Sequence, residues 1–225
     1  MNSRLFASRL LTCVLASSAF LCVAACGPPA PMIQYTISIE TISQTPPQER
    51  QSVAEAYRAH YLSQVQVDHV GFLLSDIEYE IGIAKMRSRE IKQREELSAM
   101  EMKRNNAMFK STAAKSADTQ MQSHKKDNDS QKLHVSYLKA QRRYLKKRLQ
   151  HANSAETHAV ATFELAKAQL AQKRKTVPKG FKIERFVTQK KRALEQMQRF
   201  EKAANSARGK ALEVRPRAAK STEKK

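Results

Sequence analysis

The chain has little of what enzymes and disulfide-stabilised domains are built from. Its 225 residues include no tryptophan, five glycines and three cysteines, which are Cys13, Cys22 and Cys26. No thiol follows residue 26, which excludes a disulfide framework and thiolate zinc sites from the rest of the chain. Glycine-rich phosphate loops, G-x-S-x-G elbows and H-E-x-x-H pairs are also absent. We therefore expect neither enzymatic activity nor a bound cofactor.

The histidines form no convincing metal site either. Of the six histidines, only His151 and His158 share a helical face, seven residues apart. No aspartate or glutamate completes a ligand set around them, and a metal ion needs three or four such ligands. We therefore expect no metal.

The first 26 residues combine a basic start, a short apolar run and small residues before a cysteine. Arg4 and Arg9 precede the apolar stretch 10–23, and Ala25 directly precedes Cys26. The stretch is shorter than the roughly 20 residues that span a bilayer, and the order of its parts is that of an export signal. This segment resembles the signal peptide of bacterial lipoproteins.

The resemblance implies that residues 1–25 are a cleaved signal peptide. It also implies that Cys26 carries a diacylglyceryl thioether and an acyl chain such as palmitate. Two or more chains make a stable membrane anchor, because each buried methylene contributes about 0.8 kcal/mol. We therefore expect a lipid-anchored protein of the bacterial cell envelope, at the outer membrane and facing the periplasm. An ordinary secretory signal cut after Ala25 is the alternative.

Residues 26–45 read as a lipidated cysteine followed by a flexible tether. The prolines in 27–31 favour an extended chain. Residues 33–39 then alternate apolar and polar side chains, a period of two that fits a short strand or a β-prone linker. We expect a linker, because a lone strand has no partner with which to pair.

Residues 46–215 have the composition of long helices. Thr45 and the prolines at 46 and 47 form a helix start, and apolar residues then recur at spacings of three and four. We expect an all-α fold, an elongated antiparallel helical hairpin or coiled coil. Its helices are expected at about 46–112, 130–175 and 181–214, and a disordered basic tail is expected over 216–225.

The third helix either continues along the hairpin or folds back to make a three-helix bundle, and the sequence leaves both open. The strongest turn signal after the tether is 127–130, Asp-Asn-Asp-Ser. We therefore expect the hairpin to close near residue 120. A second break is expected at 176–180, Thr-Val-Pro-Lys-Gly.

The predicted core of the first helix is one apolar seam. Residues 77–83 alternate like a strand, but we expect helix there because the flanking segments are strongly helical. Gly71 and Gly82 lie three turns apart on one stripe beside the seam, which favours close packing within the domain, with a hinge or a partner groove as the alternative. The first seam comprises Val53, Ala56, His60, Ser63, Val67, Val70, Leu74, Ile77, Ile81, Ala84, Ser88 and Ile91, and the second comprises Leu138, Arg142, Leu145, Leu149, Ala152, Glu156, Ala159, Phe163, Ala166 and Leu170.

Charge is distributed unevenly along the chain. The net charge of the whole chain is +20. Residues 46–112 hold ten basic and ten acidic residues and are neutral, whereas residues 130–225 hold twenty-six basic and seven acidic residues. In a cell envelope such a polycation faces anionic lipid, lipopolysaccharide, peptidoglycan or an acidic protein, and we expect no nucleic acid. The candidate binding residues are Arg142, Arg143, Lys146, Lys147, Arg148, Lys190, Lys191 and Arg192.

A plainer interpretation is that some of these charges pair between helices. In a hairpin that closes near residue 120, Arg142 to Arg148 would lie opposite Glu95, Glu96 and Glu101. Exposed pairs of this kind contribute less than about 1 kcal/mol each.

These features together predict a non-catalytic envelope lipoprotein. Its basic helical domain would be a spacer or docking module for an anionic surface or a partner coiled coil, and it could form a homo-oligomer. The lipidated start, helical body and terminal Lys225 are loosely similar to the murein lipoprotein, although this chain is far longer. The hairpin is similar to those of efflux and secretion adaptors, which makes a transport or secretion subunit the alternative, together with an accessory regulator of an envelope enzyme.

Overall fold

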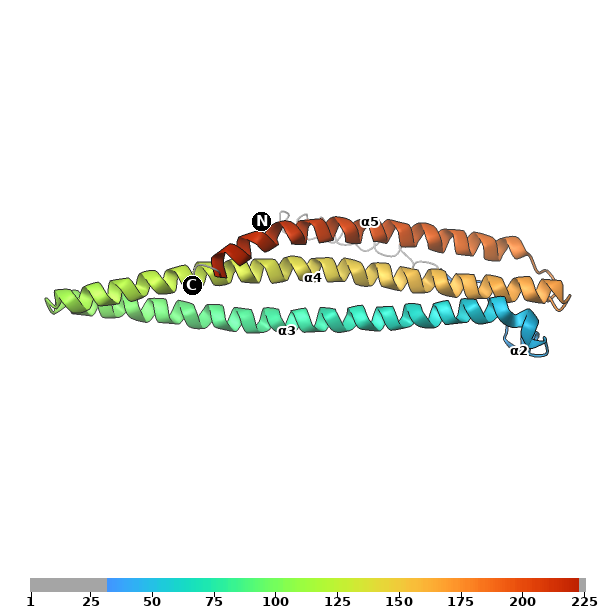
Figure 1. Ribbon diagram of the computed structural model, residues 1–225, viewed down its shortest axis with the longest axis horizontal. Coiled ribbons are helices and arrows are strands. Elements are labelled where there is room, and N and C mark those ends of the chain that lie inside the picture. The colour runs from blue at the N-terminus through green and yellow to red at the C-terminus, as the bar shows by residue number, and fades with distance from the viewer. Residues whose placement is uncertain (1–31, 223–225) are drawn as a thin grey trace, which may run out of the picture. The chain divides into compact units, whose positions relative to one another are not determined.

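A computed structural model of the chain describes residues 32–222, and describes side chains up to residue 215. The segment 1–25, Cys26 and residues 223–225 lie outside this range. Within it the chain is helical and has no strand, which confirms the predicted all-α class (Figure 1). All the helices belong to a compact unit that begins at Tyr35. They are α2 (Glu40–Ser43), the short 3-10 helix η1 (Pro47–Arg50), α3 (Gln51–Ala107), α4 (Ser111–Lys173) and α5 (Ile183–Thr222).

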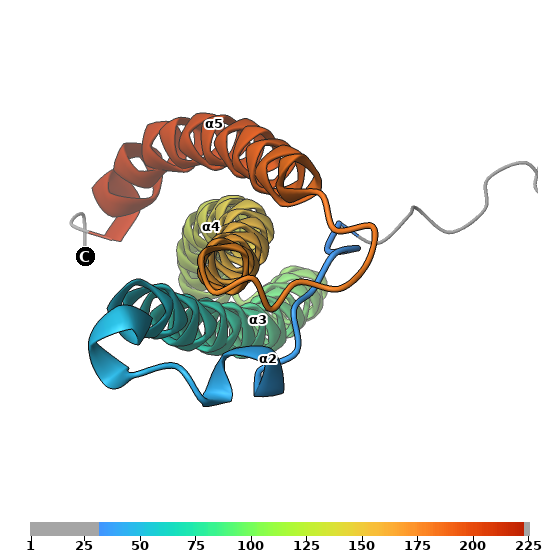
Figure 2. The ribbon, with the colours of Figure 1, turned by 90° about the vertical axis from the view of Figure 1, so that its right-hand side faces the viewer.

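Helix α4 is the middle of three long helices. It packs along α3 to form the predicted antiparallel hairpin, and α5 folds back along its other side. Figure 2, which looks along the helices, shows α4 between α3 and α5. Helices α3 and α5 have little or no contact with each other. Of the two arrangements left open by the sequence, folding back is therefore the one observed, but it does not close into a bundle.

The apolar seam of α3 packs against α4 as predicted. Val53, Val70, Ile77, Ile81 and Ala84 are all buried, and the last three form one cluster with Leu138 and Leu145 of α4. Residues 77–83 are helical, as expected. The first helix was predicted to start at residue 46, which is close to the observed start, because the 3-10 helix η1 supplies one turn before α3.

The expected close packing at two glycines of α3 was wrong. Nothing lies within 4 Å of the position that a Cβ atom would take at Gly71 or Gly82. No described element approaches this part of α3 closely. The glycines therefore serve no packing within residues 32–222.

The hairpin turn was predicted in the wrong place. It lies at 108–110, not near residue 120, and the supposed turn at 127–130 is inside α4. Packing overrides the turn residues there: Asn128 is buried and its Nδ2 donates to Glu95 Oε2 of α3 at 3.2 Å. Ala114 and Ala117 are also buried, so the seam continues through the segment that we expected to be a loop.

The actual turn is a Schellman motif built around Phe109. Its backbone N–H donates to Asn106 O at 3.1 Å, and Lys110 N donates to Asn105 O at 2.9 Å. Phe109 has φ of 57°, the left-handed conformation that glycine adopts most readily. The pair Asn105-Asn106 was the available signal for this helix end, since asparagine favours helix termini.

The second break was placed correctly. Helix α4 ends at Lys173 and α5 begins at Ile183, and Gly180 has φ of 78° in the connection between them. The expected end of the third helix at 214 was too early, because α5 continues to Thr222. Pro216 lacks an N–H donor and its ring crowds the preceding turn, but the arginines and alanines around it favour helix.

Candidate functional site

The predicted basic cluster lines a groove between α4 and α5. The groove has a volume of about 650 Å³. Its basic residues on α4 are Arg143, Lys146 and Lys147, and α5 adds Lys210, which sequence reasoning missed. Lys210 lies far from the cluster along the chain, so no local pattern could find it before the fold-back of α5 was known. The apolar part of the lining consists of Ala140, Ala203, Ala207, Ala211 and Val214.

Part of the cluster is neutralised by α3. Arg142 Nε donates to Glu78 Oε1 at 2.7 Å, and Lys146 Nζ lies 4.0 Å from the same oxygen. The expected partners Glu95, Glu96 and Glu101 were wrong, because the turn near residue 109 shifts the register of the hairpin. The interhelical pairing itself was anticipated, but it involves a different acid.

The remaining charges of the groove have no acidic partner. Arg143, Lys147 and Lys210 are exposed and form no ion pair within residues 32–215. Lys147 Nζ donates only to Gln150 Oε1, at 3.1 Å. Three cations around an alanine floor therefore face solvent, where they attract anions.

The other predicted residues lie elsewhere. Arg148 points to the α3 side, where it shares a hollow with His69 and His151. Lys190, Lys191 and Arg192 lie on α5, and Lys190 is close enough to His158 of α4 to affect its protonation. His158 is some 11 residues further along α4 than Lys147, or roughly 16 Å at 1.5 Å per residue. The structure therefore does not join the two basic groups into one site.

His158 is a half-buried titratable side chain of α4. Burial lowers its pKa below the ordinary value, and the positive charge of Lys190 lowers it further. Its Nε2 atom is buried and has no hydrogen-bond partner in the part of the chain that the structure describes. The folded protein therefore favours the neutral form of the imidazole at pH 7.

A second arrangement of polar groups holds the extended segment 35–37 against α4 and α5. Tyr35 N donates to Gln189 Oε1 at 2.9 Å, and Gln189 Nε2 donates back to Tyr35 O at 3.1 Å. Ile37 N donates to Glu164 Oε2 at 2.8 Å, and Ile37 O accepts from Lys167 Nζ at 2.6 Å. Side chains thus supply the hydrogen bonds that a neighbouring strand would otherwise make.

The expected flexible tether therefore ends before Tyr35. Ile37 and Ile42 are buried in a core cluster with Leu165 and Phe186. Glu164 and Lys167 also pair with each other at 2.7 Å and are almost fully buried. Removing one partner of such a pair costs about 3–5 kcal/mol, because the other charge is left buried alone. The pair thus fixes where the segment docks.

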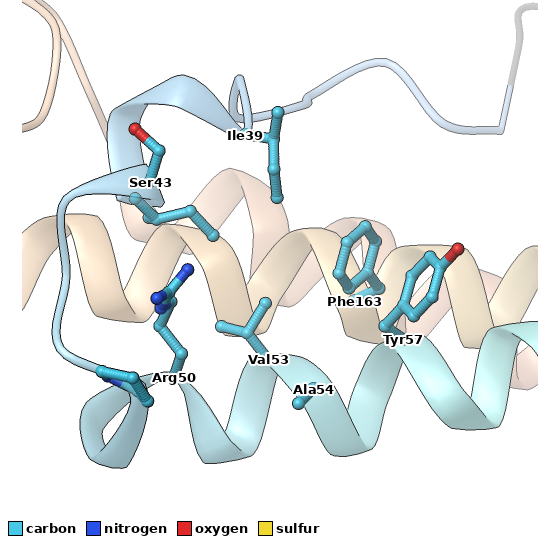
Figure 3. A pocket seen from close by; sticks show the side chains of 9 residues that line it. Ile39, Ser43, Arg50, Val53, Ala54, Tyr57 and Phe163 are labelled. Atoms are coloured by element: carbon cyan, nitrogen blue, oxygen red, sulfur yellow. The ribbon is translucent and has the colours of Figure 1, made fainter.

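An apolar cavity of about 620 Å³ lies beside the docked segment, where α2 passes over α3. Figure 3 shows Tyr57 and Phe163 at one end of it and Arg50 at the other. The ring centroids of Tyr57 and Phe163 are 5.6 Å apart. The Nε atom of Arg50 is buried and has no hydrogen-bond partner among the described residues. This cavity is separate from the basic groove, since its one α4 residue, Phe163, is well removed from Lys147.

Other site types find no support in the described part of the chain. No three His, Cys, Asp or Glu side chains between residues 32 and 215 gather at metal-binding distance. Over the described residues, no helix combines the length and apolar character needed to cross a bilayer.

Comparisons with known proteins add no assignment. No protein-family model, no curated protein and no solved structure matches this chain.

Proposed function

We propose that the chain is a non-catalytic lipoprotein of the bacterial cell envelope whose helical domain docks onto an anionic surface through the α4–α5 groove. The observation that carries this proposal is the set of unpaired cations at Arg143, Lys147 and Lys210 around an alanine floor. Phosphate groups of lipid or lipopolysaccharide combine negative charge with adjoining apolar chains, which fits such a lining. Peptidoglycan carboxylates would use the cations alone.

The N-terminal part of the proposal rests on Cys26 and the segment before it. A lipid anchor at Cys26 would hold the helical domain near a membrane, where the effective concentration of anionic headgroups is high. The groove would then need only modest affinity, at about 1 kcal/mol per basic residue near an anionic surface. Anchor and groove together would make a two-point attachment.

The test compares two triple charge reversals in protein that begins at Gly27. One variant combines Arg143→Glu, Lys147→Glu and Lys210→Glu. The matched control combines Lys175→Glu, Lys179→Glu and Lys182→Glu, which changes net charge equally in the exposed α4–α5 connection. Binding to vesicles of phosphatidylglycerol and to lipopolysaccharide is measured by cosedimentation at low and physiological salt.

We expect the groove variant to lose roughly a hundredfold in affinity, since it removes three favourable contacts of about 1 kcal/mol each. The control should lose much less, and binding of the unaltered protein should fall with salt because exposed charges are screened over about 8 Å at 0.15 M. Equal losses from both triples would mean that binding follows net charge, which contradicts a groove.

One observation favours the alternative, a subunit or adaptor of a transport or secretion assembly. Phe109 at the hairpin tip is 95% exposed, and the neighbouring Met108 is exposed as well. An apolar side chain at the end of a hairpin suits end-on docking with a partner protein. Such docking should be lost in Phe109→Ser, whereas vesicle binding through the groove should not change.

A further inference from the structure

Helix α3 has a second apolar stripe. It begins at Val65, which lines a hollow with Arg148 and His151 of α4, and it continues on the face of α3 away from α4. Its large side chains recur every seven residues from Val65, with one polar interruption at Gln93. Phe72 and Tyr79 are each 73% exposed, so no described segment covers them. We call this set the outer stripe; it comprises Val65, Phe72, Tyr79, Met86, Gln93 and Met100.

The outer stripe explains why residues 77–83 alternate like a strand. At 3.6 residues per turn, positions two apart lie on roughly opposite sides of a helix. Ile77 and Ile81 are buried against α4, whereas Tyr79 points away from it. The alternation therefore records two apolar faces of one helix. In Figure 2 the far side of α3 faces away from both α4 and α5.

The length and spacing of the outer stripe fit another helix. From Val65 to Met100 it covers 36 residues, about five heptads, with one large side chain in each heptad apart from the polar Gln93. Such a narrow line fits the contact along a second helix. Exposed apolar surface on this scale marks an interaction site in a folded protein. The partner should therefore present a matching helical stripe.

The charges beside the outer stripe are divided into two halves of opposite sign. Residues 64–84 contain four acidic and no basic residues, whereas residues 85–100 contain five basic and three acidic residues. Two of those basic residues are already paired, Lys92 with Glu96 and Arg94 with Glu90, so the free cations lie close to the centre of the stripe. The exposed residues Asp68, Asp76 and Glu80 form no ion pair within residues 32–215, and neither do the exposed Lys85, Arg87 and Arg89. A second α3 that runs antiparallel would lay its basic half against this acidic half, whereas a parallel one would oppose like charges.

The centre of such a pairing falls at a glycine. Residues 65 and 100 are equally distant from the junction of Gly82 and Ile83. Glycine in a helix interior costs about 1 kcal/mol relative to alanine, yet nothing in the described chain lies within 4 Å of a Cβ built at Gly82. At the crossing point of two helices the missing side chain permits close backbone approach.

We propose that two copies of the chain pair through the outer stripe, as an antiparallel contact between the two α3 helices centred on Gly82. The self-complementary order of charges favours a second copy over an unrelated helix, because a two-fold axis places each half against its complement. The contact uses the face of α3 away from α4, so the α4–α5 groove stays free in both copies. The proposal does not rest on the proposed function.

The test measures the mass of the full chain in mild detergent by light scattering, over a range of concentrations. We expect a dimer that Phe72→Ser with Tyr79→Ser converts to a monomer. The matched control, Val187→Ser with Leu212→Ser, replaces similarly exposed apolar residues on α5 and should stay dimeric. Helical circular dichroism of each variant shows whether the fold is kept.

Charge reversal tests whether the two α3 helices run antiparallel. Because a combined variant should restore the dimer, it also separates a lost contact from a lost fold. Asp76→Lys with Glu80→Lys, or Arg87→Glu with Arg89→Glu, should each weaken the dimer about tenfold or more. Combining all four substitutions should restore it, because the two halves are again complementary. Failure of the fourfold variant to recover would overturn the antiparallel arrangement. A monomeric unaltered chain, or association that survives the Phe72 and Tyr79 substitutions, would overturn the interface.

Discussion

Phe109 occupies the one position of the hairpin turn that glycine would fill with the least strain. The left-handed conformation costs a side chain roughly 1–2 kcal/mol relative to glycine. Lys175 occupies the equivalent position at the end of α4, with φ of 55°. Helices usually end at glycine or asparagine in this conformation, and neither Phe109 nor Lys175 is one of them. This is one reason why the first turn was misplaced.

Phe109→Gly should therefore stabilise the hairpin. We expect the free energy of unfolding to rise by about 1 kcal/mol, less a fraction for the greater freedom of glycine in the unfolded chain. Urea denaturation followed by circular dichroism measures the change. Phe109→Ala is the control, since it removes the ring but keeps the Cβ atom. If alanine stabilises as much as glycine, backbone strain is not the cause.

His158 should make stability depend on pH. Its pKa is lowered in the folded state by burial and by Lys190, so the unfolded chain binds a proton more readily than the folded chain. The contribution of the neutral His158 to the free energy of unfolding is therefore fully present above the ordinary histidine pKa of about 6.5. It is lost as the pH falls from there toward the lowered folded value.

We accordingly expect the melting temperature to fall between pH 7.5 and pH 5 by more in the unaltered protein than in His158→Gln, which cannot titrate. Lys190→Gln should reduce the pH dependence in part, because it removes the smaller of the two causes. Parallel pH profiles for all three proteins would count against this assignment.

At the scale of the elements, α4 shows where packing prevails over local sequence. Its residues 127–130 have the composition of a turn, yet they are helical because Asn128 and the alanines before it pack against α3. The seam positions of α3 and α4 could be predicted because three-four spacing survives along a straight helix. The docked segment 35–37 could not, since a Glu164–Lys167 pair at i and i+3 is typical of an exposed helix surface.

Ala117→Glu tests the continuity of α4 directly. Ala117 is 4% exposed, so a glutamate there must bury a charge or push α3 away, and we expect a loss of about 2 kcal/mol or more in the free energy of unfolding. Ser116→Glu is the matched control on the exposed side. Thermal melting of the two variants gives the comparison, and similar melting temperatures would argue for a loop at this position.

At the scale of the whole molecule, the arrangement of three helices in a row leaves two separate surfaces, and each of the two proposed contacts uses one of them. The groove between α4 and α5 has the unpaired cations, and the far face of α3 has the outer stripe. Sequence located the basic residues of α4 because they are adjacent in the chain. It could not place Lys210 beside them or separate Lys190 from them, because both depend on how α5 returns along α4.

Cys26→Ala should release the protein from membranes. The lipid proposed on Cys26 would be the main anchor, and the groove alone would bind only in a salt-dependent way. Fractionation of cells at high salt and labelling with a palmitate analogue measure the effect. Retention of the Cys26→Ala protein on membranes at high salt would contradict the lipoprotein assignment.

The docking of Tyr35 and Ile37 determines how the helical domain would respond to mechanical load. Tension applied through the chain that precedes Tyr35 meets four hydrogen bonds, from Gln189, Glu164 and Lys167, before it reaches α3. Those bonds connect to α4 and α5, so the force enters the middle of the helical array and bypasses the first turn of α3. We therefore expect tension on the chain before Tyr35 to break these hydrogen bonds before it unwinds the first turn of α3.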